Sequence, residues 1–196
     1  MDIGKYTFEE YCGLAVMFHG YSAPGVLVGG YMVEYAKAAM PEGVLYEAVV
    51  ETRACLPDAV QLLTPCSTGN QRMKVLPLGR FALALYDKNS GEGVRVHLDA
   101  AKLSAWPEIL AWFIKSKKKA DQDVDRLFKE IEAAGNTVCG IGPITIQPRY
   151  LGHTHGGLVQ PCPACGEYYP AKDGPVCKGC QGEAPYLPGQ NTRPPE

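Results

Sequence analysis

The chain has 196 residues, of which 46% are apolar and 20% are charged, and its formal net charge is −2. This length allows one ordinary domain with a small appendage. The near-neutral charge argues against a general attraction to nucleic acid or to an anionic membrane. Because no segment has the pattern of a targeting signal or the roughly 18 uninterrupted apolar residues of a membrane helix, we expect a cytoplasmic protein.

The first half of the chain predicts two helices and a strand. Apolar residues at helical spacing predict a helix over residues 8–20, and a second helix is predicted between Ser22 and Pro41. Residues 43–54 alternate in polarity as a strand does. Three glycines within the second helix weaken it and predict a close approach by another element: Gly25, Gly29 and Gly30.

The second half predicts a sheet completed around two further helices. A loop is expected over residues 55–70. The predicted strands cover residues 72–87, 93–100 and 142–152, and the predicted helices cover residues 106–113 and 124–131. Prolines in the last strand indicate an edge position in the sheet. Four lysines after the first of these helices predict a solvated helix end rather than a phosphate site, because acids follow at once: Lys115, Lys117, Lys118 and Lys119.

The predicted architecture is an α+β core domain followed by a small metal module. The core covers residues 1–150, a Gly-rich linker residues 151–160, the four-cysteine module residues 161–185, and a disordered tail residues 186–196. We expect the module to be of the zinc-ribbon or treble-clef type. No internal repeat is present.

Two Cys-x-x-Cys pairs, eleven residues apart, define the module: Cys162, Cys165, Cys177 and Cys180. Two tight turns at this spacing can aim four thiolates at the corners of a tetrahedron, which suits one structural zinc ion per chain. Two disulfides or an iron–sulfur centre are the alternatives. A closed four-sulfur site has no open position for water or substrate, so its role is to hold a fold.

The charge of the module favours protein contact over nucleic-acid binding. From residue 160 onward the chain has three basic and four acidic residues, whereas phosphate contact needs a basic surface. Tyr168 and Tyr169 are expected to cover the sulfur cluster or to contact a partner.

A second group of motifs resembles the FmdE family, which is named for the FmdE component of formylmethanofuran dehydrogenase. The family's typical order is His-Gly-His-x-Cys-Pro-Gly, then Cys-x-x-Asp-Ala-Ile/Val-Gln, then Cys-Thr/Ser-x-Gly-Asn. The chain matches it with "HGYSAPG" from His19, "CLPDAVQ" from Cys55 and "CSTGN" from Cys66. The resemblance covers about residues 8–185, because some members also carry a four-cysteine module. It implies an intertwined homodimer with an α+β core.

The resemblance also implies a second metal site in the core domain. The candidate ligands are His19, Cys55, Asp58 and Cys66; an imidazole, a thiolate and an oxygen ligand would make an open zinc or iron site. Two family ligands are replaced, by Tyr21 and Ala23. The alternative is that His19 bonds a backbone carbonyl while Cys55 and Cys66 pack in the core.

The remaining cysteines and histidines are expected to have no role in metal binding. Cys12 and Cys139 are predicted to be core residues. His97, His153 and His155 are predicted to be solvated, with His155 as a reserve ligand.

Three functions remain open on the sequence, and whether the chain is an enzyme is undecided. The first is a non-catalytic, zinc-containing accessory or regulatory subunit, a homodimer that contacts dehydrogenase subunits and senses or carries a metal. The second is a metal-dependent enzyme on a small molecule, with His19 and Cys55 holding the ion and Asp58 as acid–base partner. The third is a zinc-finger regulator of RNA or DNA.

Overall fold

A computed structural model describes residues 2–152 and 157–187 of the chain. The chain divides into a core unit up to Gly152 and a second unit from His153 onward. His153, His155 and the tail from residue 188 lie outside the described residues, so the predictions for them stay predictions. The mixed helix-and-sheet core with its four-cysteine module confirms the predicted fold class.

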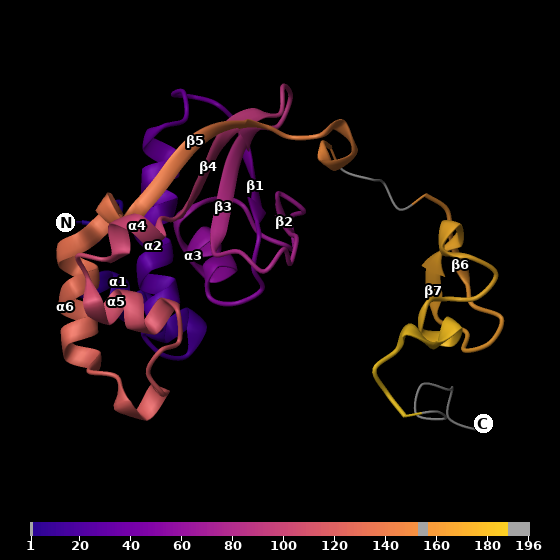
Figure 1. Ribbon diagram of the computed structural model, residues 1–196. Coiled ribbons are helices and arrows are strands. Elements are labelled where there is room, and N and C mark those ends of the chain that lie inside the picture. The colour runs from indigo at the N-terminus through magenta and orange to yellow at the C-terminus, as the bar shows by residue number, and fades with distance from the viewer. Residues whose placement is uncertain (1, 153–156, 188–196) are drawn as a thin grey trace. The chain divides into compact units, whose positions relative to one another are not determined.

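A five-stranded sheet in the order β2-β1-β3-β4-β5 organises the core unit (Figure 1). Only the β1–β2 pair is parallel. The strands are β1 (Tyr46–Val50), β2 (Met73–Val75), β3 (Ala82–Asp87), β4 (Glu92–Leu98) and β5 (Cys139–Thr145). The turn after β3 makes a β3–β4 hairpin, and β5 lies at an edge, as its prolines predicted.

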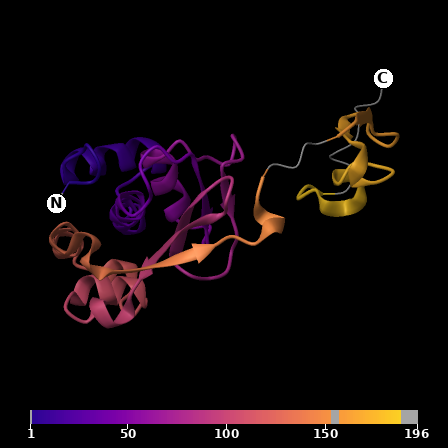
Figure 2. The same cartoon turned by 90° about the horizontal axis from the view of Figure 1, so that it is seen from above.

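The helices gather around α2, which packs against β3 and β4 and is flanked by α1, α3 and α6 (Figures 1 and 2). They are α1 (Phe8–His19), α2 (Pro24–Ala38), α3 (Leu56–Leu63), α4 (Ala100–Leu103), α5 (Pro107–Phe113) and α6 (Val124–Ala134). Short 3-10 turns cover Lys119–Asp121, Gly135–Val138 and Pro148–Tyr150. Ten of the fifteen residues of α2 are buried, as expected for a helix that is apolar on every side.

No single described helix is long and apolar enough to cross a membrane. The α1–α2 pair, bent by 117°, meets the length and composition requirement only when the two helices are taken together.

Two sequence predictions for the core unit were wrong. Residues 56–63 form α3 rather than a loop; Leu56, Ala59, Val60 and Leu63 have helical spacing, and Pro57 suits the first turn. Residues 72–87 form two strands rather than one. Pro77 and Gly79 interrupt the run, and β2 and β3 flank β1 on opposite sides.

The glycines of α2 bring this helix close to α3, as predicted. A Cβ atom on Gly29 would lie 2.8 Å from the Cβ of Ala59, so only glycine permits this packing distance. The contact between the two helices fixes where the first turn of α3 stands relative to the start of α2.

The described part of the second unit is small and has little apolar interior. Strands β6 (Val159–Pro161) and β7 (Tyr168–Pro170) pair antiparallel, and short helical turns cover Ala171–Asp173 and Gly179–Glu183. Its buried cluster consists of Cys162, Cys165 and Tyr169.

Candidate functional site

The four cysteines of the second unit converge on one point. Their sulfur atoms all lie within 4.8 Å of one another, and all eight cysteines of the chain are free of disulfides. Four thiolates at this separation fit a tetrahedral zinc ion. A metal here takes the place of the apolar core that the unit lacks.

Hydrogen bonds and one tyrosine support the sulfur cluster. The backbone N–H of Cys177 donates to the sulfur of Cys162 at 3.4 Å, and this donation lowers the pKa of Cys162 to about 6. Tyr169 packs against the cluster and donates its hydroxyl to the carbonyl of Gly174 at 2.7 Å. Tyr168 instead is 74% exposed, so the two expected roles, covering the sulfurs and facing outward, fall to different tyrosines.

In the core unit, three residues predicted as metal ligands come together where α1 and α3 meet. His19 is the last residue of α1, Cys55 precedes α3, and Asp58 lies in the first turn of α3. The Nδ1 atom of His19 lies 2.5 Å from a carboxylate oxygen of Asp58, and its Nε2 atom lies 4.0 Å from the sulfur of Cys55. We call these three residues the core site.

Cys55 has an unusual backbone conformation that depends on a glycine neighbour. Its φ is 57° and its ψ is −52°, a left-handed conformation that costs free energy for a residue with a Cβ atom. A Cβ atom on Gly25 would lie 2.7 Å from the Cβ of Cys55. The start of α2 therefore leaves space for the thiol, and strain of this kind is typical of functional positions.

The order thiol, imidazole, carboxylate also occurs in cysteine hydrolases, but the electrostatics oppose that role. Burial raises the pKa of the Cys55 thiol, and the nearby charge of Asp58 raises it further. A nucleophilic cysteine needs a lowered pKa to be a thiolate near neutral pH. A metal ion stabilises the thiolate by displacing the proton, so the site suits metal binding better.

The measured distance fits a shared ion between His19 and Cys55. Zn–N bonds of about 2.0–2.1 Å and a Zn–S bond of about 2.3 Å, at a tetrahedral angle, separate nitrogen and sulfur by about 3.6 Å. The observed 4.0 Å exceeds that value by a few tenths of an ångström. Asp58 bonds the opposite ring nitrogen, so it orients the imidazole, as carboxylates commonly do behind metal-binding histidines.

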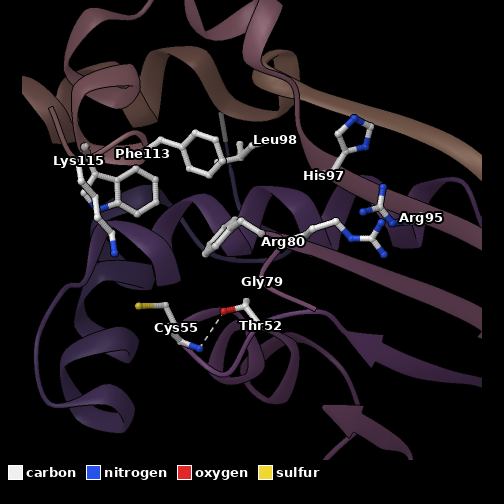
Figure 3. Close-up of a pocket in the computed structure, with 12 residues that line it drawn as sticks. Thr52, Cys55, Gly79, Arg80, Arg95, His97, Leu98, Phe113 and Lys115 are labelled. Atoms are coloured by element: carbon white, nitrogen blue, oxygen red, sulfur yellow. Dashed lines mark hydrogen bonds between the residues drawn. The ribbon is translucent and has the colours of Figure 1, made fainter. Parts of the chain in front are cut away.

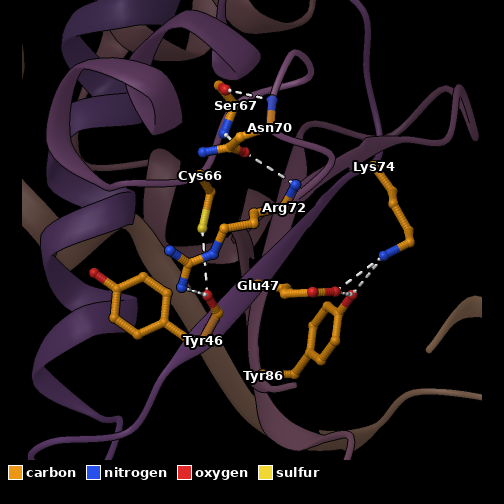
Figure 4. A network of polar contacts seen from close by, with 8 residues as sticks. All are labelled: Tyr46, Glu47, Cys66, Ser67, Asn70, Arg72, Lys74 and Tyr86. Carbon is orange, nitrogen blue, oxygen red and sulfur yellow. Dashed lines mark hydrogen bonds and ion pairs between the residues drawn. The ribbon is translucent and has the colours of Figure 1, made fainter. Parts of the chain in front are cut away.

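Cys66 does not join the core site. It is fully buried and donates its thiol to the carbonyl of Tyr46 at 3.5 Å, and the same carbonyl accepts a bond from Arg72 (Figure 4). No described group of three ligands within 4.8 Å contains it. The "CSTGN" motif instead shapes a turn, in which Ser67 and Asn70 bond each other's backbone N–H groups.

Two cavities of about 690 and 350 Å³ meet at the core site. Both are lined by Cys55, Trp112 and Lys115. The larger runs from these residues to Arg95 and His97 on β4 (Figure 3). The smaller is lined by Tyr21 and Ala23, which replace two ligands of the family motif.

The chain matches two family models. "FmdE, Molybdenum formylmethanofuran dehydrogenase operon" covers residues 18–142, and "FmdE treble clef zinc finger" covers residues 153–187. The chain belongs to the FmdE family. The family assignment made from the three motifs is thereby confirmed, and the four-cysteine module is of the treble-clef type.

A solved structure of high similarity supports the assignment. The crystal structure of an FmdE-like protein of tungsten formylmethanofuran dehydrogenase, from Syntrophus aciditrophicus, is 52% identical, with a TM-score of 0.88. The match covers 95% of this chain and 98% of that one.

A curated relative is longer. The "Probable S-adenosyl-L-methionine-binding protein" of Archaeoglobus fulgidus is 30% identical over 194 residues, 84% of this chain. The FmdE chain spans about half the length of that relative.

Sequence reasoning missed most of the cavity wall. Arg80, Arg95 and Trp112 come from three separate elements, and no motif marks them. His97, predicted to be solvated, is half-buried, and its Nδ1 atom is enclosed without a hydrogen-bond partner among the described residues. The lysine run is solvent-exposed as predicted, but three of its members line a cavity: Lys115, Lys117 and Lys119.

Proposed function

We propose that the core unit binds a transition-metal ion through His19 and Cys55 and presents it to a small molecule in the adjoining cavities. The observation that carries this proposal is the arrangement around one imidazole. Asp58 holds Nδ1 at 2.5 Å, and Nε2 faces the Cys55 sulfur at 4.0 Å. Two protein ligands leave coordination positions open, as in metal sites that take up a substrate.

A metal at this site would supply Lewis acidity toward a ligand oxygen, which is the chemistry that an open zinc or iron site offers. The chain's own residues do the positioning. Asp58 fixes the ring of His19, and Gly25 lets Cys55 approach the start of α2. Trp112 lines both cavities at this point, so it shields the thiol from solvent on that side.

Metal counting on the purified chain tests the proposal. We expect the wild type to hold one more metal ion per chain than the variants Cys55→Ser and His19→Ala. Cys12→Ser is the matched control, because Cys12 is another half-buried thiol of the core unit that lies outside the core site. An equal metal content in the wild type and Cys55→Ser contradicts the proposal.

A second candidate, an accessory subunit that acts by protein contact, is supported by exposed apolar side chains on the zinc-finger module. The most exposed are Leu158, Tyr168 and Leu187, at 75%, 74% and 70%. The net negative charge of the module opposes phosphate contact, so a protein is the better partner. The family relationship makes subunits of formylmethanofuran dehydrogenase, and a second copy of this chain, the first partners to test.

The accessory role is tested with purified components. Co-elution with dehydrogenase subunits should be lost in the variant Tyr168→Ser and retained in Lys178→Ser, a polar exchange on the same module. Sedimentation of the chain alone reports the predicted homodimer. Sedimentation as a monomer, together with no co-elution, removes this candidate.

The archaeal relative's printed name favours a small-molecule ligand for the cavities and makes S-adenosylmethionine a specific probe. Calorimetric titration with this compound checks that ligand. Binding that requires Trp112 would place it in these cavities, whereas no heat of binding would restrict that ligand to the longer relative.

A further inference from the structure

The two cavities at the core site are lined by cations without a compensating acid. Among the described residues that line them there are five lysines and arginines and no aspartate or glutamate: Arg80, Arg95, Lys115, Lys117 and Lys119. The chain as a whole has a net charge of −2, so the positive charge here is local. Cations that line a concave, low-dielectric wall attract anions more strongly than cations on an open surface do.

At the far end of the larger cavity, two arginines share one buried carboxylate. Glu51 is 5% exposed; Nε of Arg80 and Nε of Arg95 each donate to it at 2.6 Å. Arg95 lowers the pKa of Glu51 by hydrogen bonding, so the carboxylate stays ionised and fixes both guanidinium groups. Two positive charges against one negative charge leave one positive charge beside the cavity.

At the near end, Lys115 is held over the junction by a strained backbone. Its φ is 55°, although glycine is the residue that normally ends a helix in this conformation. Its backbone N–H bonds the carbonyl of Trp112, and its ammonium group makes no ion pair among the described residues. Lys117, by contrast, is bound to Glu108, and Lys119 lies 5.3 Å from the ring centre of Tyr21.

Between these ends the wall of the larger cavity is apolar. Phe81 packs edge-on against Trp112, with ring centres 6.0 Å apart, and Phe113 and Leu98 complete the lining (Figure 3). His97 lies at the arginine end, and its enclosed Nδ1 atom lacks a partner among the described residues. An unpaired buried nitrogen costs free energy, and an acid group bound in the cavity is a candidate partner for it.

From these features we propose that the larger cavity binds an organic anion, with its carboxylate or phosphate group at Arg80 and Arg95 and its apolar body against Phe81 and Trp112. The cationic ends select the charge, and the aromatic wall selects the body. This inference deepens the proposed function, because it names the class of small molecule that reaches the core site, but the anion contacts themselves do not require the metal.

A pair of probes that differ only in charge tests the inference: 4-phenylbutanoate and its neutral amide. Calorimetric titration of the full chain should show the carboxylate binding at least about tenfold more tightly than the amide, an energy of about 1.4 kcal/mol. High salt should weaken only the carboxylate. Equal affinity for the two probes, or no binding of either at millimolar concentration, overturns the inference.

Three variants locate the anion site. Arg80→Gln should lower the carboxylate affinity about tenfold, because Arg80 is 59% exposed and Glu51 keeps Arg95 as its partner. Lys115→Gly should weaken it by a smaller factor while folding at least as well, since glycine relieves the strained φ. Lys118→Gly is the control, because Lys118 belongs to the same run but lines neither cavity. Unchanged carboxylate affinity in Arg80→Gln contradicts the inference.

The variant Cys55→Ser separates this inference from the proposed function. We expect it to lose the core metal and still to bind 4-phenylbutanoate. Probe binding by a chain that never holds the second metal removes the metal proposal alone. A second metal without preference for the carboxylate removes the anion inference alone.

Discussion

The FmdE chain has two clusters of metal-ligand side chains that are built in opposite ways. In the zinc-finger module, four sulfurs enclose one point, and only three of its described residues are buried around it. In the core unit, His19 and Cys55 stand at the edge of an extensive apolar core and face two cavities. The module uses its ligands in place of a core, whereas the core unit folds around α2 and leaves its ligands free for binding.

This difference separates stability from exchange. A site whose ligands hold the fold cannot release its metal without unfolding. A site attached to an independently packed fold can gain, lose or share an ion, because apolar burial supplies the stability. The departures from the family motif are consistent with this division: Tyr21 and Ala23 alter the core site, and all four cysteines of the module are present.

The largest effect should follow from removing one sulfur of the module. Cys165→Ser leaves three thiolates, and the apparent free energy of structural zinc binding, about 10–16 kcal/mol in finger peptides, is then largely lost. We expect the amide NMR signals of residues 157–187 to collapse to unfolded positions while those of the core unit stay in place. Retention of dispersed signals from the module would contradict the claim that its ligands replace a core.

A pair of glycine variants distinguishes packing from ligand placement. Gly25→Ala and Gly29→Ala each force a new Cβ atom to within 2.7–2.8 Å of another side chain, so each should lower the free energy of unfolding by about 1–3 kcal/mol. Only Gly25 touches Cys55. Urea denaturation should therefore show similar losses, whereas metal counting should show loss of the core ion in Gly25→Ala alone. Loss of the ion in both variants would mean that the core site depends on the fold as a whole.

A smaller effect is expected at the carboxylate behind the imidazole. Asp58→Asn removes the charge that orients His19, and substitutions of this kind reduce metal affinity by about 10–100-fold. Competition with a chelator measures the affinity. Asp125→Asn, at an exposed position in α6, is the control, and it should leave the affinity unchanged. Equal affinities in both variants would show that Asp58 does not support the site.

Local patterns predicted well where one interaction dominates the residue choice. The Cys-x-x-Cys pairs predicted the sulfur cluster, and the three motifs predicted the family. Helix α3 was also readable, since its leucines, alanine and valine have helical spacing, but the prolines and cysteines around it suggested a loop. Cys66 shows the limit of a motif: its spacing matches the family, yet its thiol bonds the carbonyl of Tyr46 in the interior.

The cavities could not be predicted, because they depend on the sheet register and on helix ends. Arg95 faces Glu51 across two strand pairings, and Lys115 reaches the cavity only through a left-handed backbone at the end of α5. Neither relation is encoded within a window of ten or twenty residues. Sequence reasoning therefore assigned these side chains to solvent-facing positions.

The smallest expected effect concerns acid stability of the core unit, which the comparison assigns to packing and ion pairs rather than to metal. Arg95 and Arg80 lower the pKa of Glu51, so its stabilising contribution is complete above the pKa of an unfolded glutamate and is lost as pH falls through the lower, folded value. The free energy of unfolding in urea should therefore fall between pH 6 and pH 3 by on the order of 1 kcal/mol more in the wild type than in Glu51→Gln. Glu92→Gln, an exposed glutamate without an ion pair among the described residues, should follow the wild type. Parallel curves for the wild type and Glu51→Gln would place the acid sensitivity of the core elsewhere.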